Sequence, residues 1–395
     1  MSDRMKVDAD LQFVQGVLDS GGQDLKKCYQ CSTCTVACPL TPEGAPFPRK
    51  EMISAQWGIK QKLIGSMDPW LCFHCNDCSD QCPRGAKPGD VMAAVRNMSI
   101  KHFATPSIVG SLTASLSGVL LLLLLPMAII AAVVYGVNVG SGFKFLDSNE
   151  TIVFSKMLSV TAIDIIFLTT VAFSLFCAYR SLRKFVLCLQ RNYPRSEDGE
   201  SLSEAIKGTI ADILTHKQFK ECGVNRSRNL AHMLTFYGFV GLAITTACVV
   251  PIHYGHVFGL WDLDTPLPFF HPVKILGNVS AASACIGILW IFGRRLTNPA
   301  VGASVSFDWT FISIVALIVA TGILAQVTRV SDLNPLAYVV YYCHLVLIFF
   351  LFAYAPNSKM AHMFYRTAAL IYARYSGRSK SIGTYRLEDK SEAVS

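Results

Sequence analysis

The chain has 395 residues, of which 52% are hydrophobic and only 16% are charged. This balance argues against an ordinary soluble enzyme, because soluble globular chains average about 25% charged residues. The net charge of +8 does not indicate a nucleic-acid-binding protein, since basic residues of membrane proteins gather on their cytoplasmic loops.

The first hundred residues are polar and carry eight of the 14 cysteines, at regular spacing, whereas the other six are scattered through the rest of the chain. Residues 1–25 predict a short helix, with Leu11, Val14 and Leu18 at helical spacing. The residues before Cys28 lack the apolar core of a signal peptide, so we expect the cysteines to stay in the reducing cytoplasm. In that compartment, regular cysteine runs indicate metal sites rather than disulfides.

Two cysteine motifs with the pattern C-x2-C-x2-C-x3-C-P lie in this region. The same spacing occurs in bacterial two-cluster ferredoxins, in which the fourth cysteine of each run binds the other cluster. The alternative is two structural zinc sites, but these usually pair C-x2-C hooks across a longer loop. We therefore predict two 4Fe–4S clusters. The ligands are Cys28, Cys31, Cys34 and Cys82 for the first cluster, and Cys72, Cys75, Cys78 and Cys38 for the second.

The segment that joins the two motifs predicts helices. Met52, Trp57 and Ile64 fall on one helical face between residues 49 and 64, and residues 91–98 predict a closing helix. The gap between the motifs is longer than in small ferredoxins. This pattern favours an α-helical ferredoxin domain that ends near Pro106.

Six apolar stretches follow, and each is long enough to cross a bilayer, which takes about 20 residues. The first contains an unbroken run of leucines and has no charged residue between Ile108 and Tyr135. We expect residues 356–375, which are amphipathic and basic, to continue the sixth helix toward the cytoplasm. The predicted spans lie near residues 108–135, 157–179, 230–251, 272–292, 308–327 and 335–355.

The distribution of Lys and Arg predicts the orientation of these spans. The loop 183–228 carries about nine such residues and the segment after Pro356 about seven, whereas the alternate loops carry few, such as Lys144 and Arg329. Because cytoplasmic loops are enriched in Lys and Arg, we expect a multi-pass protein of the cytoplasmic (inner) membrane. Its iron–sulfur domain and its C-terminus are predicted to face the cytoplasm.

Histidines in and beside the spans predict haem ligands. Ionisable residues at membrane depth are functional candidates, and neutral imidazole is a common axial ligand of haem iron. His232 lies near the cytoplasmic start of the third span, His344 inside the sixth, and His362 on its continuation. Eighteen residues of helix rise about 27 Å in five turns, so His344 and His362 share one face at two depths. We expect two haem b groups, with His232 and His362 as the cytoplasmic axial pair.

The partner of His344 is less directly indicated. His253 follows His232 by about 31 Å of helix, which matches the other pair, and it is the favoured ligand. His256 and His271 are alternatives, and each of these histidines could instead be a hydrogen-bonded residue without a metal.

A quinone site is predicted at the far-side mouth of the fourth span. His271 and Lys274 lie there and could hydrogen-bond a quinone carbonyl and take its proton. The alternative for Lys274 is a side chain that only snorkels to the interface. His216 lies in a polar loop and is not assigned a role.

The chain therefore divides into three predicted parts. Residues 1–104 form a cytoplasmic iron–sulfur domain, residues 105–375 a transmembrane haem b domain, and residues 376–395 a cytoplasmic tail. The predicted fold class is all-α: an α-helical ferredoxin domain followed by a six-helix bundle like that of b-type cytochromes.

At this point the residues resemble known families. Residues 26–100 resemble the C subunit of heterodisulfide reductase. The segments Arg228-x-x-x-His232-x-x-x-Phe236-x-Gly238-Phe239 and His344 to Pro356-x-Ser358-Lys359-x-x-His362 are similar to the haem b subunit of that enzyme and to the gamma subunit of respiratory nitrate reductase. The fusion of both modules most resembles the C subunit of quinone-interacting membrane-bound oxidoreductase complexes of sulfate-reducing prokaryotes.

The resemblance implies electron exchange between menaquinone and cytoplasmic adenylylsulfate reductase through flavin-bearing subunits like heterodisulfide reductase A. No G-x-G-x-x-G follows a strand here, so flavin is expected on a partner. The nitrate reductase subunit has a second histidine ten residues after the first, where this chain has Leu242. Rival functions are the equivalent subunit of a sulfite-reductase-linked or disulfide-reducing complex, and a zinc-binding membrane scaffold.

Overall fold

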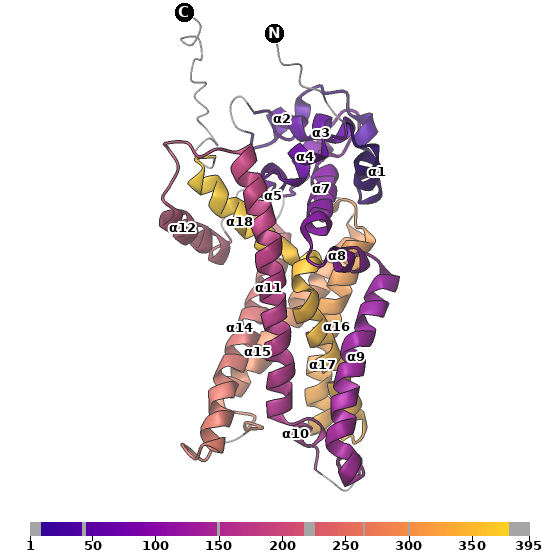
Figure 1. Ribbon diagram of the computed structural model, residues 1–395, viewed down its shortest axis with the longest axis vertical. Coiled ribbons are helices and arrows are strands. Elements are labelled where there is room, and N and C mark those ends of the chain that lie inside the picture. The colour runs from indigo at the N-terminus through magenta and orange to yellow at the C-terminus, as the bar shows by residue number, and fades with distance from the viewer. Residues whose placement is uncertain are drawn as a thin grey trace, which may run out of the picture.

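The structure, a computed structural model, describes residues 9–41, 45–147, 151–216, 226–263, 265–298 and 301–378. A cluster of short helices that carries the cysteines sits at one end of a bundle of long helices (Figure 1). The described residues contain helices and no strand, which confirms the predicted all-α class. The last part of the predicted tail, residues 379–395, lies outside the described residues.

The cysteine-bearing end is built from short helices separated by turns. Its helices are α1 (Leu11–Asp19), η1 (Leu25–Lys27), α2 (Thr33–Ala37), α3 (Arg49–Gln56), α4 (Lys60–Ile64), α5 (Asp68–Leu71), α6 (Asp77–Asp80) and α7 (Pro88–Phe103). Gly58, at a φ of +67°, ends the predicted linker helix early, so that α3 and α4 replace it. Helix α7 buries Val91, Met92 and Val95 in the core and forms the floor of the cysteine-bearing end.

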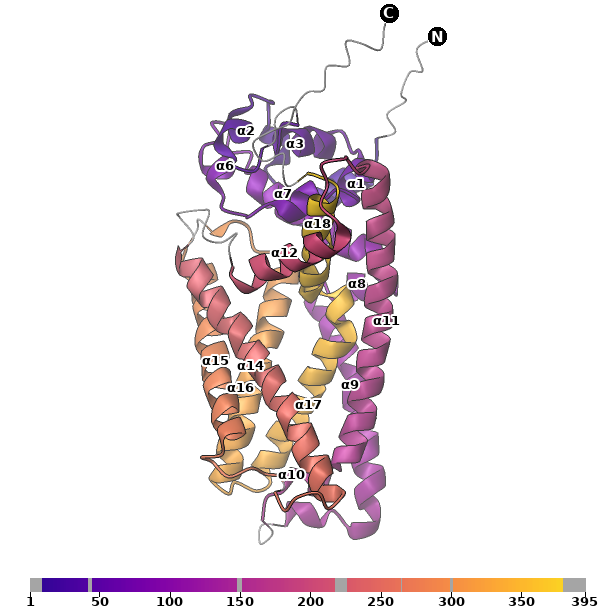
Figure 2. The same ribbon diagram turned by 90° about the vertical axis from the view of Figure 1, so that its left-hand side faces the viewer.

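Six helices are long and apolar enough to cross a membrane, which confirms the predicted number. They run side by side below the cysteine-bearing end (Figures 1 and 2). They are α9 (Leu116–Asn138), α11 (Val160–Asn192), α14 (Arg226–Val257), α15 (Pro272–Thr297), α16 (Ser306–Val330) and α17 (Leu336–Tyr354). The remaining helices are α8 (Ser107–Leu112), η2 (Val139–Ser141), η3 (Lys144–Leu146), α10 (Phe154–Met157), α12 (Leu202–Leu214), η6 (Ala355–Asn357), η7 (Lys359–Ala361) and α18 (His362–Tyr375).

The second span, α11, continues to Asn192, well past its predicted end near residue 179, and two further spans differ in how they begin or end. The first span begins at Leu116 rather than at residue 108, because Ser115 caps a new helix by accepting a hydrogen bond from the Gly118 amide. The sixth helix also does not continue into residues 356–375. It ends at Tyr354, and the two short turns η6 and η7 separate it from α18. His344 and His362 therefore lie on different helices.

Small residues bring α14 and α15 into close contact. A Cβ atom at Gly287 would lie 2.4 Å from the Thr235 hydroxyl oxygen, and one at Gly238 would lie 2.6 Å from the Ala284 amide nitrogen. Such close backbone approach is the usual way in which membrane helices pack without a hydrophobic driving force. This close packing against α15 holds α14, the helix that carries His232, in its position.

One apolar core joins the cysteine-bearing end to the long helices. Trp70 of α5 stacks on Tyr365 of α18 at a ring-centroid distance of 5.3 Å, and Phe185 of α11 packs edge-on against both rings. Phe103 of α7 completes this aromatic group. This core includes residues from both sides of residue 104, where the sequence predicts a domain boundary. The boundary itself stays a prediction.

Candidate metal centres

Four thiols gather in the outer part of the cysteine-bearing end, and we call them the first thiol group: Cys28, Cys31, Cys34 and Cys82. Burial raises the pKa of Cys34 to about 11, and the three neighbouring thiols contribute to this rise. Ser32, at a φ of +71°, takes the left-handed conformation that turns the chain between Cys31 and α2. The structure thus brings together the crossed set of cysteines expected from the motif spacing.

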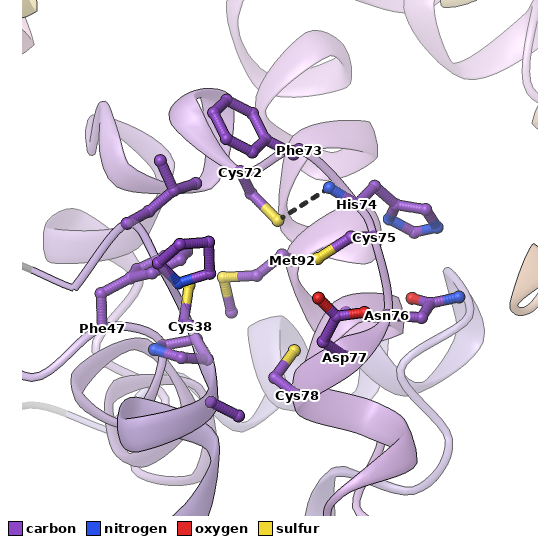
Figure 3. A pocket seen from close by; sticks show the side chains of 15 residues that line it. Cys38, Phe47, Cys72, Phe73, His74, Cys75, Asn76, Asp77, Cys78 and Met92 are labelled. Atoms are coloured by element: carbon purple, nitrogen blue, oxygen red, sulfur yellow. Dashed lines mark hydrogen bonds between the residues drawn. The ribbon is translucent and has the colours of Figure 1, made fainter. Parts of the chain in front are cut away.

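The second thiol group, Cys38, Cys72, Cys75 and Cys78, lines a hollow between α2, α5, α6 and α7. Figure 3 shows the four sulfur atoms pointing toward one shared space. Burial is the main cause that raises the pKa of Cys78, and the other three thiols of the group raise it as well. In the second thiol group, as in the first, three cysteines come from one motif and the fourth comes from the other motif.

Polar hydrogens point at several of these sulfur atoms. Hydrogen bonds to iron–sulfur ligands are one of the ways in which proteins set cluster potentials. The His74 amide donates to Cys72 Sγ, drawn as a dashed line in Figure 3, and the Ala86 amide donates to Cys82 Sγ, both at 3.4 Å. The Gln30 side chain donates to Cys28 Sγ, also at 3.4 Å.

The arrangement of the thiols fits two cubane clusters. Thiols held together in this way raise one another's pKa, because their thiolate forms repel each other. Bound iron offsets this repulsion by favouring the thiolates. Across the described ranges, no three His, Cys, Asp or Glu side chains are placed to hold a single metal ion.

His362, the first residue of α18, has one ring nitrogen left for a ligand bond. Its Nδ1 lies 2.6 Å from the Lys359 carbonyl oxygen, and a carbonyl only accepts, so Nδ1 carries the proton. Burial lowers the pKa of His362 to about 4, which keeps the imidazole neutral. The Nε2 lone pair is then available for iron, and the hydrogen bond at Nδ1 is typical of metal-ligating histidines.

His232 of α14 lies close enough to His362 to interact with it electrostatically. Its Nδ1 is 3.2 Å from Nε2 of His216, a residue that sequence reasoning had not assigned to any site. His216 Nδ1 faces the Leu214 carbonyl oxygen at 3.4 Å and must donate to it, so His216 Nε2 accepts from His232 Nδ1. The proton of His232 therefore sits on Nδ1, as it does in His362.

His216 lies in a polar loop of the sequence, and no role was assigned to it. In the structure its side chain is only 4% exposed and packs against Phe236 as well as His232. In the sequence it was only a histidine in the polar loop before the third span. Local pattern alone does not place such a residue beside another helix.

His344 of α17 shows the same arrangement at another depth of the bundle. The Thr321 hydroxyl donates to the Leu317 carbonyl at 2.7 Å, so it accepts from His344 Nδ1 at 3.0 Å. Gly322 lies against the ring, and a Cβ atom there would be 3.0 Å from the imidazole Cε1. The three histidines at the predicted positions 232, 344 and 362 thus fit axial ligands of haem iron.

The other predicted site residues lie on α14 and at the start of α15. His253 packs its ring against Tyr254, and its pairing with His344 stays a prediction. His271 caps α15 by accepting from the Val273 amide at 3.3 Å, and the Lys274 ammonium donates to Gln326 at 2.7 Å. Gln326 is therefore an additional candidate at the predicted quinone site.

Comparison with known proteins identifies the cysteine-bearing end. Residues 24–86 match the family model of the 4Fe-4S dicluster domain, so this part of the chain carries such a domain, in agreement with the predicted clusters and against the zinc alternative. The chain is 29% identical over 109 residues to an Archaeoglobus profundus protein described as like the C subunit of heterodisulfide reductase. It is also 34% identical over 97 residues to the C subunit of the H(2):CoB-CoM heterodisulfide,ferredoxin reductase of Methanothermobacter marburgensis.

The extent of these similarities differs between relatives. The matches cover 27% and 24% of this chain, and 58% and 52% of the two relatives, so the chain spans about half the length of these curated relatives. Citrate utilization protein B of Escherichia coli is 25% identical over 382 residues, which cover 91% of this chain and 93% of that protein. No solved structure matches the chain. The comparisons thus establish an electron-transfer iron–sulfur protein related to the C subunit of heterodisulfide reductase.

Proposed function

We propose that this chain is the membrane subunit of a respiratory oxidoreductase complex that passes electrons between menaquinone and cytoplasmic flavin-bearing partners. The partners are subunits like heterodisulfide reductase A, and the electrons go toward adenylylsulfate reductase in sulfate respiration. The observation that carries the proposal is a continuous series of candidate redox sites. The loop that begins the second cysteine motif accepts hydrogen bonds from Arg228 and Arg366, on the same two helices as His232 and His362, which lie close together.

The proposed ligands follow the geometry. The first thiol group holds one 4Fe–4S cluster and the second thiol group holds the other. His232 and His362 hold one haem b through their Nε2 atoms, and His344 with His253 holds a second. When bound, these groups carry one electron at a time, which is what an oxidation of quinol in two single steps requires.

The residues of the chain supply positioning and proton transfer. His216, Thr321 and the Lys359 carbonyl fix the tautomers of the candidate axial histidines. At the far-side mouth, His271 and Lys274 bind the quinol, and the two protons that leave with its two electrons pass one at a time through the His271 imidazole to the water on that side. The Gln326 amide oxygen holds the Lys274 ammonium at that position.

The proposed location is the inner membrane, with the iron–sulfur domain and the C-terminus in the cytoplasm. The basic loop 183–228 and the basic tail support this orientation. Electrons from the quinone pool then cross toward the soluble partners on the same side as the clusters.

One preparation tests the proposal. The full chain in lipid nanodiscs is analysed for iron, acid-labile sulfide and haem, and its reduced-minus-oxidised spectrum is recorded after adding a menaquinol analogue. We expect haem b bands and bleaching of the iron–sulfur absorption, and neither change when a quinone-site inhibitor is added before the quinol. Protein that is fully loaded with clusters and haem but is not reduced by the quinol would contradict the quinone role.

The coverage of 91% by citrate utilization protein B favours a second candidate function. The same electron path would then serve citrate utilization with a different soluble partner. Co-purification of the native complex separates the two, since flavin-bearing heterodisulfide reductase A-like subunits are expected only for the first candidate.

A further inference from the structure

Three arginines from three different helices reach the loop that begins the second cysteine motif. We call residues 72–74 the cysteine loop. The acceptors are backbone carbonyl oxygens at or beside this loop. Arg96 of α7 donates to Pro69 and Cys72 at 3.3 Å, Arg228 of α14 donates to Phe73 at 3.2 Å and His74 at 2.7 Å, and Arg366 of α18 donates to Cys72 at 3.3 Å.

Two of these arginines lie one helical turn from a candidate haem ligand. Arg228 precedes His232 by four residues on α14, and Arg366 follows His362 by four residues on α18. Residues four apart lie on the same face of a helix, about 6 Å apart along its axis. The helix faces that present the two imidazoles thus also hold the loop of the second thiol group.

The first thiol group lies on the other side, away from the long helices. Helix α2, which carries Cys34, is at the outer end of the molecule in both views (Figures 1 and 2). Cys31 is exposed, and the neighbouring side chains of Tyr29 and Val36 are 69% and 88% exposed. A partner protein can reach this group directly.

We propose that the two clusters act in a fixed order, in which the second thiol group exchanges electrons with the haem site at His232 and His362, and the first exchanges them with the soluble partner. Arg228 and Arg366 are positioning residues that tie the inner cluster to the haem-bearing helices and raise its reduction potential. This inference rests on the proposed function.

The charge of the arginines gives the direction of the effect. Reduction adds one electron to a cluster while oxidising the haem by one, so the reduced cluster is more negative. Guanidinium groups stay protonated in proteins, and a positive charge beside a cluster favours its reduced state. Because the contacts lie in a partly buried junction, solvent screens this charge less than it would at the surface.

The test is a potentiometric titration of the full chain, loaded with clusters and haem, followed by electron paramagnetic resonance. Cys75→Ser and Cys31→Ser identify the signals of the inner and outer clusters. We expect Arg366→Met to move the midpoint potential of the inner cluster to a more negative value and to leave the outer cluster unchanged. Arg366→Lys keeps the charge and is expected to shift the inner cluster less.

Arg374→Met is the matched control, because Arg374 lies on the same helix and pairs instead with Glu200 and Asp212. It is expected to shift neither cluster. No shift in Arg366→Met, or a shift of the outer cluster, would overturn the inference. If Arg366→Met does not assemble the inner cluster, Arg228→Met is titrated in the same way with the same expected result.

The test is independent of the proposed quinone role, because the titration uses a chemical reductant. Normal potentials with no reduction by quinol would count against the proposed function alone. A protein that is reduced by quinol but shows no effect of Arg366→Met and Arg228→Met on the inner cluster would count against this inference alone.

Discussion

Replacing His216 with alanine isolates the hydrogen bond that orients one candidate haem ligand. The His216 ring accepts from His232 Nδ1 at 3.2 Å, and this contact holds the proton of His232 on Nδ1. Loss of such a partner of a metal-ligating histidine typically lowers metal affinity about 10–100-fold, or roughly 1.4–2.8 kcal/mol. The cost of leaving a buried donor unsatisfied is similar, about 1–3 kcal/mol.

Titration of haem-depleted protein with haem measures this effect. We expect His216→Ala to weaken haem binding by about 10–100-fold and to change the low-spin signal of the remaining haem. His216→Gln places an amide oxygen that can accept the same hydrogen bond, and it is expected to recover part of the affinity. His102→Ala serves as the control, since His102 packs against Phe103 at the end of α7.

The reasoning is refuted if His216→Ala binds haem as tightly as the unchanged protein and gives the same low-spin signal. Such a result would mean that His232 is held by other contacts or that it does not bind iron. Because His216 is only 4% exposed, thermal unfolding of the variant is measured in parallel. A general loss of stability would weaken cluster binding as well, whereas loss of orientation affects only the haem.

Three further outcomes are expected. Cys75→Ser lowers iron and sulfide content by about half, as measured by chemical analysis, because the first thiol group is complete without Cys75. Gly322→Ala pushes a methyl group against the His344 ring, 3.0 Å from its Cε1, and removes one of two haem signals; two unchanged signals would rule out His344 as a ligand. Burial, with Asp68 nearby, raises the pKa of Glu51 to about 7, so the stability that protonated Glu51 contributes falls as pH rises from about 5 to about 7. Glu51→Gln should abolish that slope in thermal melts, and a slope that persists would assign it to another group.

Local chain geometry explains why the thiol groups were predictable. The C-x2-C spacing forces three thiols of each motif to one side of a short turn, and the proline turn sends the fourth cysteine across. Long apolar runs also carry their own signal, because only a helix satisfies the backbone within a bilayer. The number of spans and the grouping of Cys34 with Cys82 therefore followed from the sequence.

The remaining features depend on contacts between distant segments. Arg228 and Arg366 reach the cysteine loop across about 155 and 294 positions of sequence, and no periodicity indicates such a contact. The end of the sixth helix was visible only as Pro356, which predicts a kink but not two successive turns. After Pro356, the course of the chain depends on the contacts that the following residues make with other helices.

Those following residues connect the helix break to the haem site. Lys359, in the turn η7, pairs with Asp308 at 2.8 Å and donates to Asn97 at 2.5 Å, so its side chain joins the turn to α16 and α7. The carbonyl of the same residue fixes the proton on His362. The same carbonyl also accepts from the backbone N–H of His362 in this turn. The interruption of the sixth helix therefore positions the carbonyl that holds the ring of His362, a candidate ligand that lies close to His232.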